Sequence, residues 1–183
     1  MHTSLDGFVA GPNGEMNWIT INEELFDFVA TMTDKADTAL YGRVTYEMMQ
    51  GYWPNAGKAP NASKHDKEHS AWYNNVSKIV LSRTMNGNGL ENTTVISENL
   101  ADNINKIKIQ GGKNILIFGS PRASHSLLSE GLIDKFWLFV NPILLGKGMP
   151  LFSGVKEITK LNLIETKTFP GGVVAMHYET KRD

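Results

Sequence analysis

Cysteine is absent from the 183-residue sequence. Without thiols the chain cannot form disulfides, bind a metal through thiolates or use a cysteine nucleophile. No apolar run reaches the roughly 18 residues that span a bilayer, and the polar start at residues 1–4 lacks the apolar stretch of a signal peptide. The 18 basic and 19 acidic residues are interspersed, which favours neither nucleic acid nor a membrane surface as partner. We therefore expect a cytoplasmic protein that binds a small molecule.

Short β-rich runs alternate with helix-length amphipathic segments, as in α/β proteins whose largely parallel sheet is covered by helices. Strands are expected at 38–41, 78–82, 93–96, 114–118 and 135–140, with a C-terminal antiparallel hairpin at 161–169 and 173–180 around Pro170-Gly171-Gly172. Helices are expected at 22–34, 45–50, 63–75, 100–109 and 121–130, and a loop at 51–60. The length predicts a single domain over residues 1–183.

Four segments place glycine or a small hydroxyl residue where a predicted strand ends, which is the edge where open α/β sheets bind ligands. They are residues 4–12, 41–46, 81–84 and 118–121. Gly119 and Ser120 precede Pro121 at a helix start, so their N–H groups can bind an anion. A tight turn with an N-cap serine explains the same pair equally well.

Two of these segments combine arginine with hydroxyl residues. Arg43 with Thr45, and Arg83 with Ser82 and Thr84, are suited to binding phosphate. Two such groups of residues together suggest a ligand with several phosphates. Either group alone is also explained by a solvated arginine beside a helix cap. The sequence contains no Gly-x-Gly-x-x-Gly motif and no P-loop motif that would account for them.

Taken in order, the segments resemble the dihydrofolate reductase superfamily, and in particular the reductase domain of the bifunctional riboflavin-pathway deaminase-reductase. The resemblance rests on Ser-Leu-Asp-Gly-Phe-Val-Ala-Gly-Pro at 4–12, Tyr-Gly-Arg-Val-Thr-Tyr at 41–46, Leu-Ser-Arg-Thr at 81–84, Phe-Gly-Ser at 118–120 and the segment 141–152. It implies a dihydrofolate reductase-like three-layer fold, with a mostly parallel central sheet, an antiparallel C-terminal hairpin and helices on both faces.

The resemblance also implies a cofactor, NADPH, and residues that bind it. Those matching the nicotinamide segment are Val9, Ala10 and Gly11; those at the cofactor phosphates are Gly42, Arg43, Val44 and Thr45; those at the 2′-phosphate are Leu81, Ser82, Arg83 and Thr84; and those of the pyrophosphate turn are Gly119 and Ser120. The family usually has two glycines in that turn, and Ser120 replaces the second.

The acid that protonates the substrate has two candidates. Glu24 matches the acidic position of the substrate helix by resemblance, although a surface glutamate stabilised by the helix dipole explains it as well. Asp6 belongs to the Ser-Leu-Asp-Gly pattern, and Asp-Gly is also a common turn pair. We expect partial burial near Trp18, in the substrate pocket, to raise the pKa of either carboxyl group toward neutrality.

The sequence therefore predicts an NADPH-dependent reductase that transfers hydride to a C=N or C=O group of a small heterocycle, resembling 5-amino-6-(5-phosphoribosylamino)uracil reductase. The alternatives are a pterin reductase of the dihydrofolate reductase type and a non-catalytic nucleotide-binding dimeric module. Apolar residues at 136–140 and in 141–152, together with the resemblance, predict a homodimer. His65 and His69 have zinc-pair spacing, but their polar neighbours favour a solvated helix face, and no metal site is expected.

Overall fold

The computed structural model describes residues 1–155 and 157–181. The chain divides into two compact units, one of Glu23–Ala123 and one of Met1–Asn22 with Ser124–Asp183. Helices and parallel strands alternate in the first unit, and the second ends in an antiparallel hairpin, which confirms the predicted α/β fold class. Among the described residues, no helix is long and apolar enough to cross a bilayer.

The Glu23–Ala123 unit is built on a four-stranded parallel sheet with the order β5-β4-β3-β6. Its strands are β3 (Ala36–Gly42), β4 (Ser77–Leu81), β5 (Thr93–Ile96) and β6 (Asn114–Ile117). Leu40 and Val80, in the middle of the two central strands, are fully buried. Such burial is expected where helices cover both faces of a parallel sheet.

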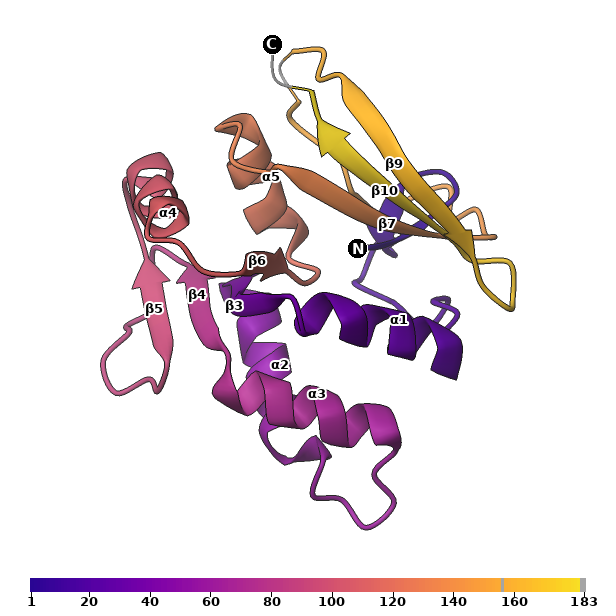
Figure 1. Cartoon of the computed structure of the whole chain (residues 1–183). Helices are drawn as coiled ribbons and strands as arrows, with labels where there is room; N and C mark the ends of the chain where they lie inside the picture. Colours follow the sequence, from indigo (N-terminus) through magenta and orange to yellow (C-terminus); the bar gives the residue numbers. More distant parts are fainter. Residues whose placement is uncertain (156, 182–183) are drawn as a thin grey trace. The chain divides into compact units, whose positions relative to one another are not determined.

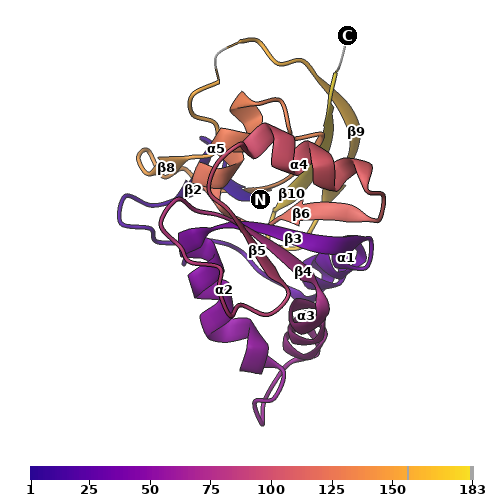
Figure 2. The ribbon, with the colours of Figure 1, turned by 90° about the vertical axis from the view of Figure 1, so that its left-hand side faces the viewer.

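Helices flank this sheet on two sides. They are α1 (Glu23–Thr33), α2 (Arg43–Ala56), α3 (Lys64–Asn75) and α4 (Leu100–Ile109). Figures 1 and 2 show α2 and α3 on one face and α4 on the other, which gives the three layers. The start of α3 is fixed by a capping box, in which the Ser63 hydroxyl accepts from the Asp66 N–H and the Asp66 carboxylate accepts from the Ser63 N–H.

The predicted loop at 51–60 is wrong in its first half, because α2 continues to Ala56 through Gly51 and Pro54. Both residues disfavour a helix interior. Tertiary packing overrides that preference: Ala56 is buried, and the Trp53 ring lies 4.1 Å from the ring of His69 on α3.

The solvated face predicted for His65 and His69 is also wrong. His65 stacks on Phe26 at 3.7 Å between ring centroids, and His69 is buried between Trp53 and Trp72. Burial lowers the pKa of His69 to about 4, so this ring is neutral at pH 7. His69 is thus buried among aromatic rings, and the half-buried His65 contacts the same cluster through Trp53 and His69.

The second unit contains a mixed four-stranded sheet with the order β1-β7-β10-β9 and a small two-stranded sheet, β2-β8. The elements are β1 (His2–Ser4), β2 (Phe8–Ala10), β7 (Lys135–Asn141), β8 (Met149–Pro150), β9 (Leu161–Thr168) and β10 (Val174–Thr180); α5 (Pro121–Ser129) precedes β7 in the chain. β1 runs parallel to β7, whereas β10 is antiparallel to both β7 and β9. The predicted C-terminal hairpin is therefore confirmed.

Exposed apolar side chains are concentrated in the second unit between residues 144 and 164. Ile158 is 94% exposed, and Leu163 and Ile164 on β9 are 55% and 49% exposed. β9 is an edge strand of its sheet, and an apolar edge strand favours pairing with another chain. The homodimer stays a prediction, and the exposed apolar side chains of this surface favour it.

Asn141 joins three segments of the second unit from a fully buried position. Its side-chain oxygen accepts from the Thr20 N–H at 2.9 Å, and its amide nitrogen donates to the carbonyls of Thr3 and Phe139 at 3.3 and 3.0 Å. Because no water reaches these groups, each bond lost leaves a buried polar atom without compensation.

Asn141→Ala should therefore lower the free energy of unfolding by about 2 kcal/mol, since the substitution leaves the Thr20 N–H without its acceptor. The check is urea unfolding followed by circular dichroism. Asn105→Ala, an exposed asparagine on α4, is the matched control and should change the value by less than about 1 kcal/mol. Equal losses for the two variants would contradict the role given to Asn141.

Candidate functional site

The carboxyl ends of the parallel strands meet at one edge of the Glu23–Ala123 unit. Gly42 at the end of β3 pairs in register with Leu81 at the end of β4, and Leu81 pairs with Ile96 at the end of β5. β6, on the other side of β3, ends at Ile117. The predicted phosphate-binding segments 42–45, 82–84 and 119–120 directly follow these strand ends. The fold thus brings three of the four predicted segments to the edge where such sheets bind ligands.

The Gly119-Ser120 turn is tied to the end of β3. The Gly42 N–H donates to the Ser120 hydroxyl at 3.0 Å, and that hydroxyl donates to the Phe118 carbonyl at 3.2 Å. Gly119 and Ser120 both have a φ of +55°, a backbone conformation that is costly for serine. The hydrogen bond from the Gly42 N–H helps to hold Ser120 in this conformation.

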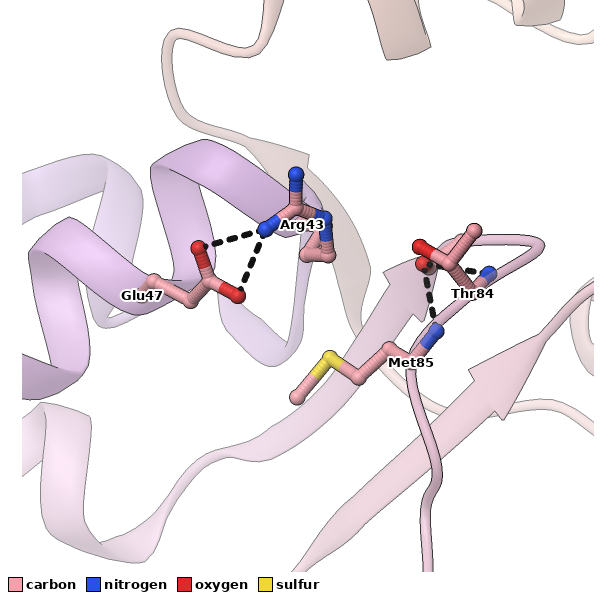
Figure 3. Close-up of polar contacts among 5 residues, drawn as sticks. Arg43, Glu47, Thr84 and Met85 are labelled. Carbon is pink, nitrogen blue, oxygen red and sulfur yellow. Dashed lines mark hydrogen bonds and ion pairs between the residues drawn. The ribbon is translucent and has the colours of Figure 1, made fainter.

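Arg43 is the first residue of α2, and its guanidinium is paired with Glu47. Both carboxylate oxygens of Glu47 lie 2.9 Å from Nη1 of Arg43 (Figure 3). The helix starts after Gly42 without a side-chain cap, and its first turn contains no acidic residue. The positive end of the helix dipole therefore faces this edge of the sheet with no acidic residue of the first turn to offset it.

Ser82 shapes the loop that follows β4. Its hydroxyl accepts from the N–H groups of Thr84 and Met85 at 3.2 and 3.0 Å (Figure 3). This turn leaves the side chains of Arg83 and Thr84 exposed. The serine therefore orders the loop, while the arginine and threonine are available to an anion. Together with Arg43, the edge presents two guanidinium groups and several hydroxyls.

The remaining predicted cofactor residues lie in the second unit, on β2 and the loop after it. Val9 and Ala10 are buried, and the Gly11 N–H donates to the Glu15 carbonyl at 2.9 Å. Trp18 is half-buried, and its indole N–H donates to the same carbonyl at 3.0 Å. The roles of these residues at a nicotinamide or a substrate stay predictions.

A cavity of about 440 Å³ lies beside β2 and β8 within this unit. The residues lining it are Gly11, Pro12, Gly14, Lys147, Gly148, Met149 and Pro150. Gly148 permits the close approach of the two loops, because a Cβ there would collide with the Ala10 carbonyl oxygen. The sequence prediction did not single out Lys147 or Gly148, although both lie in the segment 141–152 that carries the resemblance.

The pKa expected for Asp6 is wrong in direction. Its carboxylate is exposed and accepts from the Ser4 hydroxyl at 2.6 Å and from the N–H groups of Gly146 and Leu145 at 2.7 and 3.1 Å. These hydrogen bonds, the Ser4 contact first, lower the pKa of Asp6 below its usual 3.8. An ionised carboxylate only accepts hydrogen bonds. The structure therefore shows Asp6 joining two loops as a hydrogen-bond acceptor, and its role as a proton donor stays a prediction.

The burial expected for Glu24 is wrong as well. Glu24 lies in the first turn of α1 beside Glu23, and it is exposed. Two acids at a helix start are stabilised by the dipole, which is the structural explanation that the sequence left open. Its catalytic role remains a prediction from resemblance.

Glu47 is the residue of this edge that sequence reasoning missed. The signal was present, because Arg43 and Glu47 are four residues apart. The predicted helix began at residue 45, so the pair did not fall within one helix. The structure begins α2 at Arg43 and places both residues on it.

Asp6→Asn should lower the melting temperature at pH 7, because an amide cannot accept from Ser4, Leu145 and Gly146 as the carboxylate does. Since the folded-state pKa is depressed, the stabilisation is present above pH 3.8 and is lost as pH falls through the lower folded value. Differential scanning calorimetry at pH 7 and near pH 3 should show the gap between wild type and variant closing in acid. Glu130→Gln, an exposed acid after α5, is the control. A gap independent of pH contradicts the assignment.

Comparison with known proteins gives the family of the chain. Residues 1–175 match the RibD C-terminal domain family. Two uncharacterized proteins of Bacillus subtilis (strain 168), YyaP and YwjB, are 33% and 30% identical over 180 residues, or 96% of this chain and 89% and 92% of theirs. The chain belongs to the RibD C-terminal domain family.

Solved structures share the fold. A protein from Shewanella sp. PV-4, provisionally assigned to riboflavin biosynthesis, has a TM-score of 0.76 at 24% identity over 100% of this chain and 97% of that one. The diaminohydroxyphosphoribosylaminopyrimidine deaminase/5-amino-6-(5-phosphoribosylamino)uracil reductase of Thermotoga maritima has a TM-score of 0.65 at 18% identity over 98% of this chain. The match covers 55% of that bifunctional protein. The chain therefore shares its fold with these two proteins.

Proposed function

We propose that the chain is an NADPH-dependent reductase that binds the cofactor phosphates at the carboxyl edge of its parallel sheet. The observation that carries the proposal is the convergence of segments 42–45, 82–84 and 119–120 on that edge, fixed by the register of β3 with β4 and β6. Membership of the RibD C-terminal domain family adds the reductase class.

The residues present suit a polyphosphorylated nucleotide. The N-terminus of α2 has no acid in its first turn, and the exposed Arg83 and Thr84 follow the neighbouring strand. A 2′-phosphate distinguishes NADPH from NADH, and a guanidinium binds a phosphate through charge-assisted hydrogen bonds. In this proposal Arg83 and Thr84 hold the 2′-phosphate, while the N–H groups that follow Gly42 and Phe118 face the other phosphates.

NADPH, when bound, supplies the hydride for a C=N or C=O group of a small heterocycle, and the Thermotoga maritima relative suggests a phosphoribosylated aminouracil as the model substrate. The atom that gains charge must be protonated or hydrogen-bonded. Asp6 is already an acceptor for three donors, so Glu24 is the carboxyl candidate for that step.

NADPH should bind at least about tenfold more tightly than NADH, because only NADPH carries the phosphate that Arg83 can hold. Arg83→Ala should remove most of this preference while leaving NADH affinity unchanged. Isothermal titration of both cofactors gives the dissociation constants. Lys106→Ala, an exposed cation on α4, is the matched control and should leave the ratio unchanged. Equal dissociation constants in the wild-type protein would refute the cofactor assignment.

One observation favours a second candidate, a non-catalytic nucleotide-binding module. Of the two predicted acids, Asp6 has a lowered pKa because it accepts several hydrogen bonds, and Glu24 is exposed, so neither carboxyl group lies in the buried setting expected of a general acid. Such a module would bind NADPH without turning over any substrate.

Turnover separates the two candidates. The reductase proposal predicts that at least one pterin, aminopyrimidine or cyclic carbonyl compound causes loss of the reduced-nicotinamide absorbance when mixed with the protein and NADPH. Glu24→Gln should slow that turnover without changing NADPH affinity. Tight NADPH binding without turnover of any pterin, aminopyrimidine or cyclic carbonyl compound favours the non-catalytic nucleotide-binding module.

A further inference from the structure

The pairing of Arg43 with Glu47 leaves half of the guanidinium group available. Both oxygens of Glu47 contact Nη1, at 2.9 Å each. A guanidinium has five N–H donors, and the edge formed by Nε and Nη2 is one of the two edges that can bind an oxyanion through two parallel bonds. Among the described residues this edge of Arg43 has no acceptor. Glu47 therefore holds the Arg43 side chain through Nη1 and leaves Nε and Nη2 available to a ligand.

Helix stability does not explain this pair. Arg43 stands at the positive end of the α2 dipole, where a cation is disfavoured. Arginine followed by glutamate is also the weaker order for a pair four residues apart. Both side chains are about half exposed, at 44% and 52%, so water screens their attraction. The position of Arg43 at the start of α2 is better explained by the binding of an anionic ligand than by helix stability.

The loop after β4 is the neighbour of this arginine. Gly42 and Leu81 pair in register, so Arg43 and Ser82 leave adjacent strands at the same edge. Figure 3 shows Glu47 on one side of Arg43 and the loop that carries Thr84 on the other.

We propose that Glu47 is a positioning residue that holds Arg43 with its Nε–Nη2 edge toward the 82–85 loop, and that it thereby sets the preference for a nucleotide with a 2′-phosphate. The inference rests on the proposed function, because it assumes that the phosphate binds at this loop. Glu47 does not touch the nucleotide. Its effect passes through the orientation of Arg43, whose side chain would otherwise sample many rotamers before binding.

The alternative to positioning is that Glu47 competes with the phosphate for Arg43. A carboxylate near a phosphate dianion repels it, and if Glu47 only competed for Arg43, removing it would strengthen binding. Positioning and competition therefore predict changes of opposite sign in the same measurement.

The experiment compares 2′,5′-ADP with 5′-AMP, because the two probes differ only in the 2′-phosphate. Glu47→Ala should weaken 2′,5′-ADP binding about threefold to tenfold and leave 5′-AMP binding unchanged, which also shows that the variant is folded. Glu47→Gln keeps one oxygen acceptor and should fall between Glu47→Ala and wild type. In an Arg43→Ala background, Glu47→Ala should have no further effect. Glu68→Ala on α3 removes an exposed carboxylate elsewhere and is the matched control.

The outcomes separate this inference from the proposed function. Unchanged or tighter 2′,5′-ADP binding by Glu47→Ala overturns the positioning role, as does an equal loss in the Arg43→Ala background. A wild-type chain that binds neither probe overturns the proposed function and this inference with it. If the wild-type chain prefers 2′,5′-ADP and Glu47→Ala keeps the same preference, only this inference is overturned and the proposed function stands.

Discussion

The parallel pairing of β3 with its two neighbours is the constraint on which the candidate site depends. In this register Gly42 lies opposite Leu81, and β6 runs alongside on the other side of β3. Parallel strands point the same way, so their carboxyl ends and the loops that follow share one edge. A shift of one residue in this register would turn each buried strand residue to the opposite face and displace the loops from one another. Burial of Leu40 and Val80 in the centre of the sheet opposes such a shift.

Local signals in the sequence were sufficient for most of the fold. The ends of α4 and β5 were predicted to the residue, because α4 is followed by glycine with a positive φ at Gly111 and β5 is a compact β-branched run. The length of α2 was not predictable, because Gly51 and Pro54 signal a loop and only the packing of Trp53 against α3 overrides them. The solvent exposure predicted for His69 was wrong for the same reason. Its immediate sequence neighbours are polar, and two of its aromatic partners, Trp53 and Phe118, come from other parts of the chain.

The sequence predicted which backbone segments form the candidate site, but it did not predict the surroundings of the charged side chains. Glycines and hydroxyls at strand ends identified the edge, since their meaning depends only on the order of strands and loops. The environment of a carboxylate depends on residues far away in the chain. Asp6 accepts its most influential hydrogen bond from the nearby Ser4 hydroxyl, but two further bonds come from the distant Gly146 and Leu145. Together these contacts lower the pKa of Asp6, whereas the sequence had suggested that it would be raised. The partner of Arg43 was closer in sequence and still depended on where the helix begins.

The central claim is that the edge formed by residues 42–45, 82–85 and 119–120 binds the phosphates of NADPH. Hydrogen-exchange mass spectrometry with and without saturating NADPH tests it directly, because backbone N–H groups that bind phosphate or become buried exchange more slowly. The account predicts slower exchange in peptides that contain these three segments, whereas peptides from the middle of α3 remain unchanged. Unchanged exchange in all three segments, with NADPH shown to be bound, would contradict it.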